Sequence, residues 1–385
     1  MKSLIEADFN NFVKVGDEFF RFDTKARKWY KTTTKKEDPT HCGLESASGD
    51  NMIKNFDDLK AYDDVLFSMC IACKIKKCPN LRNLKYFIRF MANEALQDKV
   101  VVNDLQMFET IDLASGGGCL VAKAGTYEGD FKCYDINNSY NKFFMDYKMP
   151  TNPTFRTVET IEKMKDVCLY RVDVDGNHQQ SDDLNKMLKL RRQWFTGFDL
   201  KLFDKLDIKY KLVKQENNMI NFDRLDADFS FLEKINQLKQ SKQKTEENKI
   251  ALTALKTFLS GFWGVMCRFD LIEAAGGEID RKYFHQIYQK NGNLLFKNPE
   301  SIYRYKCAIV KPFIMAYARS RIVKQITKCT KKGYQVVYSH TDSIITDAPA
   351  KYFDIGTDIG EWKIVENENA HKGVTITNIA VKNFF

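Results

Sequence analysis

Hydrophobic and polar positions follow two different periods along this chain, and the period predicts where strands and helices lie. Strand-like runs occur at Glu18-Phe-Phe-Arg-Phe22 and at Phe131-Lys-Cys-Tyr-Asp135. Helix-like runs occur over Leu84–Asn93, across about 229–268 and over Pro312–Ile326. The chain is therefore expected to contain both kinds of element.

Two of the helical runs carry further information. The Lys/Gln/Glu-rich stretch Leu238–Lys249 leads into the apolar stretch Ala251–Leu259, and this order is typical of a long two-helix finger. The run Pro312–Ile326 predicts an amphipathic helix, whose basic face consists of Arg319, Arg321 and Lys324. Such a face is usually solvated unless other features point to DNA.

The stretch Gly333–Asp347 has the pattern of a β-hairpin, with two arms rich in Val, Ile and Tyr around His340-Thr-Asp-Ser343. Asp342 would then lie at the tip. A tight hairpin holds a carboxylate rigidly at a sheet edge, where it can share a divalent metal with a carboxylate of a neighbouring strand. Asp135, at the end of a strand-like run, is the natural second carboxylate. The alternative is that Asp342 merely favours the turn.

Ser115-Gly-Gly-Gly118 interrupts the chain before this strand. Three consecutive glycines remove every side chain and permit positive φ, which suits a tight loop or a close approach of the backbone to a phosphate. Taken alone, a glycine run is more often a plain linker.

Composition narrows the class of protein. The chain has 385 residues, of which 44% are hydrophobic, and its formal net charge of +9 favours polyanionic partners. Nucleic acid, nucleotides and anionic membranes all remain open. The N-terminus lacks the apolar segment of a secretion signal, and no run of about 18 apolar residues occurs. We therefore expect a soluble, intracellular protein.

The ten cysteines are irregularly spaced and are expected to be reduced thiols. Cys70, Cys73 and Cys78, with His41 and Cys42 upstream, could supply the ligands of a zinc site. A second Cys-x-x-Cys pair is missing, and the first pair lies in an apolar stretch. Cysteines that serve as small core residues are therefore the favoured interpretation.

Several motifs, taken in order, resemble those of family B DNA polymerases. Tyr338-Ser-His-Thr-Asp-Ser343 is similar to their motif C, Tyr-x-Asp-Thr-Asp-Ser, and Tyr134-Asp-Ile-Asn-Asn-Ser-Tyr140 to their motif A, Asp-x-x-Ser-Leu-Tyr-Pro. Between these, Lys256–Gly264 resembles motif B, Lys-x-x-x-Asn-Ser-x-Tyr-Gly. Gly360-Glu-Trp362 and Lys382-Asn-Phe384 fall where the family has a Gly-x-Trp element and a Lys-x-Tyr motif.

Two more matches resemble the protein-primed branch of that family, which serves bacteriophages and linear plasmids. Ser115–Gly118 is similar to the Tyr-x-Gly-Gly loop before motif A, and Trp194–Tyr210 to the segment between motifs A and B. The resemblance covers roughly 113–385. It implies a viral or plasmid-encoded enzyme that acts in a host cell.

The resemblance implies an α+β fold. A right-hand polymerase palm, made of an antiparallel sheet with packed helices, is expected over 113–385, with helical fingers at about 229–268. The thumb is expected to be reduced or absent. Residues 1–112 are expected to form an N-terminal region with a reduced exonuclease domain or none.

The chain departs from the family pattern at several positions. In motif C, His340 replaces the first Asp; the substituted positions of motifs A and B are Asn138, Ser139, Asn141, Ser260, Gly261 and Trp263. The two principal metal ligands of the family survive as Asp135 and Asp342. Because His340 removes one negative charge, we expect weaker Mg²⁺ binding and a preference for Mn²⁺.

The site residues implied by the resemblance fall into three groups. Asp135 and Asp342 are the catalytic metal ligands, and the carbonyl of Ile136 completes the metal site. The nucleotide-binding residues are Tyr140, Lys244, Lys256 and Trp263, and the DNA-binding residues are Gly116, Gly117, Thr341 and Lys382. Tyr140 matches the tyrosine that excludes a ribose 2′-hydroxyl.

The implied function is template-directed DNA synthesis by two-metal nucleotidyl transfer from a dNTP to a primer 3′-hydroxyl or to a hydroxyl of a terminal protein. Mg²⁺ is the expected cofactor, and Mn²⁺ an alternative. The expected partners are primer–template DNA, dNTP, a terminal priming protein and a second chain that supplies a thumb or an exonuclease. One alternative is a decayed family B relative that acts as a DNA-binding or structural subunit. Another is an unrelated two-carboxylate nuclease.

Overall fold

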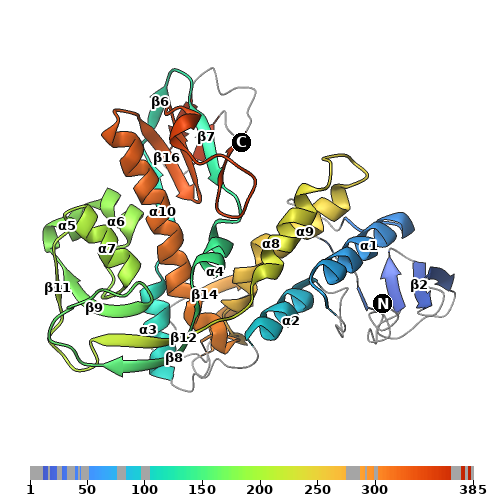
Figure 1. Ribbon diagram of the computed structural model, residues 1–385, viewed down its shortest axis with the longest axis horizontal. Coiled ribbons are helices and arrows are strands. Elements are labelled where there is room, and N and C mark those ends of the chain that lie inside the picture. The colour runs from blue at the N-terminus through green and yellow to red at the C-terminus, as the bar shows by residue number, and fades with distance from the viewer. Residues whose placement is uncertain are drawn as a thin grey trace. The chain divides into compact units, whose positions relative to one another are not determined.

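The computed structural model forms two compact units, Met1–Gln97 with Asp228–Met266 and Asp98–Ala227 with Cys267–Phe385. Figure 1 shows their elements coloured along the chain. The residues that the structure describes are 12–15, 18–23, 28–32, 40–41, 44, 52–75, 84–96, 105–274, 287–290, 293–298, 302–365, 374–377 and 380–382.

In the part of the first unit that the structure describes, a small sheet is combined with four helices. The sheet has the strand order β3-β2-β1-β4. Its strands are β1 (Phe12–Val15), β2 (Glu18–Asp23), β3 (Lys28–Thr32) and β4 (Thr40–His41). The helices are α1 (Phe56–Ala72), α2 (Leu84–Leu96), α8 (Ser230–Gln240) and α9 (Lys249–Met266).

Helix α9 is the centre of this unit, because α1, α2 and α8 all pack against it. Phe258 of α9 lies 5.5 Å from Phe87 of α2, and Phe262 of α9 lies 5.3 Å from Phe231 of α8, measured between ring centroids. The predicted pair of helices is confirmed in α8 and α9. The sequence analysis places the fingers, at about 229–268, in the same part of the chain as the palm, 113–385. In the structure, Asp228–Met266 belongs to one compact unit with Met1–Gln97.

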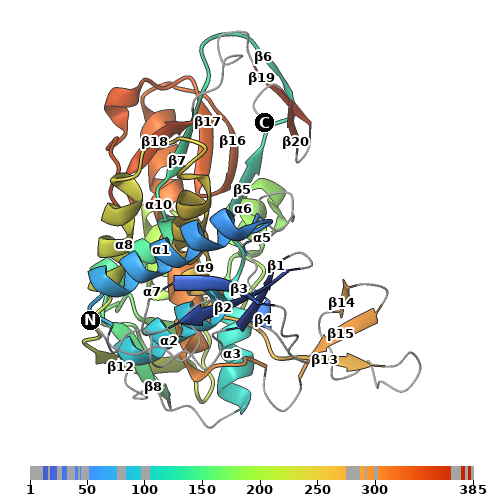
Figure 2. The ribbon, with the colours of Figure 1, turned by 90° about the vertical axis from the view of Figure 1, so that its right-hand side faces the viewer.

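The second unit is built around a five-stranded sheet with the order β18-β7-β17-β16-β5, in which all neighbours are antiparallel. Figure 2 shows β7, β17 and β16 side by side. The strands are β5 (Cys119–Ala122), β7 (Lys132–Ile136), β16 (Val336–Thr341), β17 (Ser343–Thr346) and β18 (Trp362–Val365). The long helix α10 (Lys311–Lys331) packs against β5, β16 and β17.

A second sheet of this unit has the order β10-β9-β12-β8, and β11 also pairs with β9. Its strands are β8 (Met149–Arg156), β9 (Cys168–Val174), β10 (Trp194–Thr196), β11 (Tyr210–Leu212) and β12 (Met219–Leu225). The helices of this unit besides α10 are α3 (Leu105–Ser115), α4 (Lys142–Asp146), α5 (Gly176–Gln180), α6 (Asp182–Leu188) and α7 (Gly197–Lys205), with the 3₁₀ turns η2 (Ser139–Asn141), η4 (Lys306–Val310) and η5 (Ala350–Tyr352).

Two three-stranded sheets complete the unit. One consists of β13 (Leu271–Ala274), β15 (Asn293–Lys297) and β14 (Ile287–Lys290); the other consists of β20 (Ala380–Lys382), β19 (Val374–Thr377) and β6 (Gly125–Tyr127). Within the described ranges, the named strands of this unit pair only in antiparallel fashion, and helices pack on the sheets. The predicted α+β class is therefore confirmed.

In the described ranges, no helix is both long and apolar enough to cross a membrane.

Candidate active site

The predicted hairpin is present, and Asp342 lies at its tip between β16 and β17. The turn is tight, because the backbone N–H of Asp342 donates to the carbonyl of His340 at 2.7 Å. Thr341 has φ +61°. A β-branched residue rarely adopts this left-handed conformation, and such strain tends to occur at functional positions.

The pairing of β17 with β7 brings Asp135 beside this tip. Ser343 is directly opposite Asp135, and the N–H of Ile136 donates to the carbonyl of Asp342 at 2.9 Å. The two carboxylates interact, since burial and the negative charge of Asp135 together raise the pKa of Asp342 to about 6. The structure thus brings together Asp135, Ile136 and Asp342, as the sequence predicts.

A lysine also reaches this pair. Lys363 of β18 is directly opposite Asp135, and its ammonium forms a salt bridge with the Asp135 carboxylate. The Lys363 side chain is 48% exposed, so it has room to swing into solvent. A metal ion that binds Asp135 would have to share this carboxylate with Lys363 or displace the lysine.

The donor set fits Mg²⁺ better than a transition metal. The described residues contain no group of three or more His, Cys, Asp or Glu side chains that could hold a metal ion. Mg²⁺ usually binds through one or two carboxylates and takes its other ligands from water and substrate phosphates. The pair Asp135 and Asp342 fits this donor set, and the binding of Mg²⁺ stays a prediction.

The raised pKa of Asp342 predicts a pH-dependent stability. A carboxyl whose pKa rises from 3.8 to about 6 on folding favours the folded state while it is protonated, and this contribution is lost as the pH rises from about 4 to about 6. Asp342→Asn removes the ionisation. We expect this variant to be more stable than the wild type at about pH 8, by roughly 3 kcal/mol, and the gain to vanish toward about pH 4.

Thermal unfolding across this pH range measures the effect, and added Mg²⁺ should stabilise the wild type more than Asp342→Asn. The matched control is Asp226→Asn, which removes an exposed carboxylate in a salt bridge to Lys148. A gain for Asp342→Asn that is the same at every pH would show that folding does not raise the pKa of Asp342.

Tyr140 lies near the same carboxylates. It belongs to the 3₁₀ turn η2, which follows Asn138 in a left-handed conformation (φ +48°). The pKa of Tyr140 is raised, first by burial and then by the negative charge of Asp342. The structure therefore brings the predicted nucleotide-binding tyrosine close to the carboxylate pair.

His340 is exposed near the end of β16. Its ring stacks near Tyr338 with a centroid distance of 6.5 Å, and its Nδ1 lies 3.0 Å from the hydroxyl of Thr341. The predicted effect of His340 on metal choice stays a prediction.

The glycine loop packs against the hairpin tip. Gly116 has φ +54°, and a Cβ added to Gly118 would lie 3.0 Å from the Cγ2 of Thr341. Only glycine permits this conformation and this approach without strain. The structure thus brings the predicted DNA-binding residues Gly116, Gly117 and Thr341 into one region.

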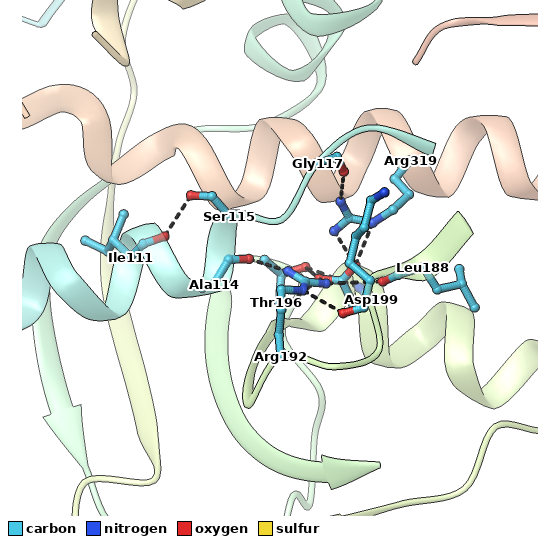
Figure 3. A network of polar contacts seen from close by, with 10 residues as sticks. Ile111, Ala114, Ser115, Gly117, Leu188, Arg192, Thr196, Asp199 and Arg319 are labelled. Carbon is cyan, nitrogen blue, oxygen red and sulfur yellow. Dashed lines mark hydrogen bonds and ion pairs between the residues drawn. The ribbon is translucent and has the colours of Figure 1, made fainter. Parts of the chain in front are cut away.

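A buried network of arginines and one aspartate holds the backbone of this loop in place (Figure 3). Arg319 of α10 bonds to Asp199 through Nη2 at 2.6 Å and to the carbonyl of Gly117 through Nη1 at 2.5 Å. Arg192 lies 3.4 Å from Asp199 and donates to the carbonyl of Ala114. Both ends of the glycine loop are therefore held by arginines that share one aspartate.

Asp199 is well suited to this role. It is the N3 residue of α7 and forms a capping box with Thr196. Burial alone would raise its pKa, but the charges of Arg319 and Arg192 outweigh burial and lower the pKa. Asp199 is 2% exposed and stays ionised.

The sequence prediction for Arg319 is wrong. It assigns Arg319 to a basic, solvated face of the helix, whereas the structure buries this residue completely, at 0% exposure. The cause is the buried partner Asp199, which compensates the charge of the guanidinium.

The other predicted nucleotide-binding residues belong to the first unit, and their roles stay predictions. Lys244 is exposed in the connection between α8 and α9, and not on a helix. Lys256 is exposed and Trp263 half-buried on α9, seven residues apart and so on the same helix face. Lys382 ends β20, and its side chain lies outside the described residues.

The cysteine cluster is described only in part, because Cys42 and Cys78 and the side chain of His41 lie outside the described residues. Cys70 is 1% exposed within α1. Burial raises the pKa of Cys73 to about 11. A buried, protonated thiol behaves as a small core residue.

No protein-family model matches the sequence, and no curated protein matches it. The structure is similar to three structures of phi29 DNA polymerase. The first, complexed with primer-template DNA and incoming nucleotide substrates, is 16% identical, with a TM-score of 0.48 over 79% of this chain and 52% of that one. The second, complexed with single-stranded DNA, is 15% identical, with a TM-score of 0.49 over 84% of this chain and 59% of that one.

The third, a binary complex with primer-template DNA, is 15% identical, with a TM-score of 0.47 over 78% of this chain and 62% of that one. The chain thus spans 52% to 62% of the length of these structures. Because the TM-scores are below 0.5, the question of function rests on the site itself.

Proposed function

We propose that this chain is a template-directed DNA polymerase of the family B type. The observation that carries the proposal is the pairing of β17 with β7, which brings Asp342 of a motif C-like hairpin beside Asp135 of a motif A-like strand. The raised pKa of Asp342 and the nearby Tyr140 support the same assignment. Two coupled carboxylates beside a tyrosine match the donor set and the steric gate that nucleotide addition requires.

In the proposed reaction, the 3′-oxygen of the primer attacks the α-phosphorus of a dNTP, a new P–O bond forms, and the α–β phosphoanhydride bond breaks to release pyrophosphate. Asp135 and Asp342, with the carbonyl of Ile136, would hold the divalent ions. When bound, these ions lower the pKa of the attacking hydroxyl and neutralise charge on the triphosphate. Two features keep both carboxylates in a fixed geometry: the hydrogen bond that the N–H of Ile136 donates to the carbonyl of Asp342, and the pairing of β7 with β17.

The remaining predicted residues would bind the substrates. Lys256 and Lys244 would pair with the triphosphate, and Trp263 would stack on the nascent base pair. Gly116, Gly117, Thr341 and Lys382 would contact the phosphates of the DNA strands. The arginine network below the loop would fix the backbone of Gly117 for this contact.

Tyr140 is expected to select deoxyribonucleotides by steric exclusion of the 2′-hydroxyl. Tyr140→Val shortens the side chain and should raise the ratio of rNTP to dNTP incorporation by about tenfold or more, since about 1.4 kcal/mol corresponds to a factor of ten. The measurement is single-nucleotide incorporation with each substrate. Tyr140→Phe, which keeps the ring, is the control, and an unchanged ratio in Tyr140→Val would show that Tyr140 is not the gate.

The proposal also covers the partners and the origin of the protein. A terminal protein that primes synthesis, a second chain that supplies a thumb or an exonuclease, and a viral or plasmid origin all follow from the resemblance to the protein-primed branch. They are proposals for the whole protein.

A second candidate function is a DNA-binding or structural subunit whose catalytic site has decayed. The salt bridge from Lys363 to Asp135 favours it, because a lysine in this position competes with metal ions for the carboxylate. The presence of His340 where the family has an aspartate favours it as well. In this case the fold would bind DNA without catalysis.

Calorimetric titration of Mg²⁺, with and without dNTP, separates the two functions. A polymerase should bind the ion more tightly when dNTP supplies phosphate ligands, and this coupling should be lost in Asp135→Asn and Asp342→Asn. A decayed relative should show weak binding that neither the nucleotide nor the substitutions alter.

A further inference from the structure

A cavity of about 490 Å³ lies in the second unit, away from the strands that carry the carboxylates. It is lined by the connection between β8 and β9, by α7 and by β12. The charged residues that line it are Lys163, Lys165, Asp166, Lys201 and Arg224. We refer to this cavity as the basic pocket.

The local backbone is built to keep the pocket in shape. The segment that carries Lys165 passes directly over the first residue of α7, Gly197, where any Cβ would collide with the carbonyl of Lys165. The N–H of Lys165 donates to the hydroxyl of Tyr170 at 3.0 Å, and its ammonium lies 3.4 Å from the side-chain oxygen of Asn221. The wall of the pocket is therefore anchored to both α7 and the sheet.

The charge of the pocket is unbalanced. It is lined by four cationic side chains and by one carboxylate, that of Asp166. This carboxylate already forms a salt bridge with Lys201 at 2.9 Å. In the whole chain, by contrast, 60 Lys and Arg residues are nearly matched by 51 Asp and Glu residues. A merely solvated surface would show a mixture of signs, whereas a pocket with an excess of cations attracts an anion.

Neighbouring side chains add to the positive charge. The pKa of Lys324 on α10 is lowered by partial burial and by the charges of Lys205, Arg321 and Lys201, although Asp166 acts in the opposite direction. The basic face of α10 thus faces the same region through Lys324. Cations that crowd together in this way are stabilised when an anion binds between them.

Two of the lining cations are available for a ligand. Among the described residues, no hydrogen bond or ion pair engages the side chains of Lys163 and Arg224, and both are exposed to solvent. Arg presents a planar fork of donors that matches a phosphate group, and Lys adds a point charge.

We propose that the basic pocket binds phosphate groups of a nucleic-acid strand, as a contact separate from the carboxylate site. The aromatic side chain of its lining, Phe222, is buried at 4% exposure and offers no surface for a base to stack on. Asn221 is already engaged by Lys165. The pocket therefore recognises the backbone of the strand and not its sequence.

Salt-dependent binding of a fluorescein-labelled single-stranded oligothymidylate tests this proposal. The pocket variant is Lys163→Gln with Arg224→Gln, and the control is Lys211→Gln with Lys214→Gln, two exposed lysines of the same unit. Fluorescence anisotropy gives the slope of log K against log salt. For two lost phosphate contacts, the slope should fall in magnitude by about 1.4 and the affinity by roughly tenfold at about 0.1 M salt. The control should keep the wild-type slope.

Equal slopes in the pocket and control variants, both with wild-type melting temperatures, would overturn the proposal, and so would a wild type that binds no oligonucleotide. Calorimetry with inorganic tripolyphosphate tests whether the ligand of the pocket is a free polyphosphate instead of a nucleic-acid strand. If the pocket variant loses tripolyphosphate but keeps the wild-type slope for the oligonucleotide, the pocket takes a free polyphosphate and not a strand. The proposal stands apart from catalysis: a wild type that binds the strand through the pocket but never extends a primer would refute only the proposed polymerase function.

Discussion

Asp135→Asn and Asp342→Asn are each expected to reduce nucleotide incorporation by about a thousandfold or more, which corresponds to roughly 4 kcal/mol of transition-state stabilisation. The two carboxylates face one site through the pairing of β7 with β17, so that loss of either leaves the metal ions undercoordinated. Asparagine keeps the shape of the side chain and removes its charge. Binding of primer–template DNA should persist, because neither substitution removes a residue that is assigned to contact the DNA strands.

Single-turnover incorporation of one dNTP measures this effect. The matched control is Asp130→Asn, which removes a 55% exposed carboxylate just before β7. Either site variant with a rate within tenfold of the wild type would refute the assignment of Asp135 and Asp342, as would an equal loss in the control.

Asp199→Ala is expected to destabilise the second unit by about 3 to 5 kcal/mol, because it leaves the buried charges of Arg319 and Arg192 without a counter-ion. Arg319 is 0% exposed and cannot turn to solvent. The substitution also removes half of the capping box of α7, namely the hydrogen bond that the N–H of Thr196 donates to the Asp199 carboxylate, which adds to the loss. Urea denaturation followed by circular dichroism measures the change.

The control for this prediction is Asp182→Ala, which breaks a solvent-exposed salt bridge to Arg191 and should cost less than about 1 kcal/mol. If Asp199→Ala costs no more than the control, the arginines find other partners and the network does not hold the glycine loop. The double variant Asp199→Leu with Arg319→Met should recover part of the loss, since it removes both members of the ion pair.

The hairpin was predictable because its signals are local. The Val, Ile and Tyr residues of Gly333–Asp347 indicate the two arms, and the polar residues between them indicate the turn. The helices α8 and α9 were predictable for the same reason, since their period lies within a short window. The pairing of Asp135 with Asp342 depends on strand order. The position of Asp135 at the end of a strand-like run made it a candidate, and the resemblance to a known family supported the pairing.

Lys363 and the arginine network were missed because their partners are distant in sequence. The Gly360-Glu-Trp element contains no sign that the next residue is opposite Asp135. Thr196-Gly-Phe-Asp199 does have the spacing of a capping box, so that the start of α7 could have been found. That Asp199 also neutralises Arg319 depends on tertiary packing.

The error at Arg319 had a signal in the sequence. Arg319 is three and four residues from Ile322 and Val323, and it follows Met315 and Ala316 at the same spacing. These positions share one helix face, and all of them are buried. The apolar period around Arg319 is therefore that of a buried position, although arginine is usually solvated.

Templated primer extension by the purified chain is the most direct test of the central claim, that Asp135 and Asp342 form the centre of a DNA polymerase. The account predicts that the wild type, with Mg²⁺ or Mn²⁺, adds the nucleotide complementary to each template base, and that neither Asp135→Asn nor Asp342→Asn does so. A folded wild type that binds the primer–template but adds no complementary nucleotide with either ion would contradict this account.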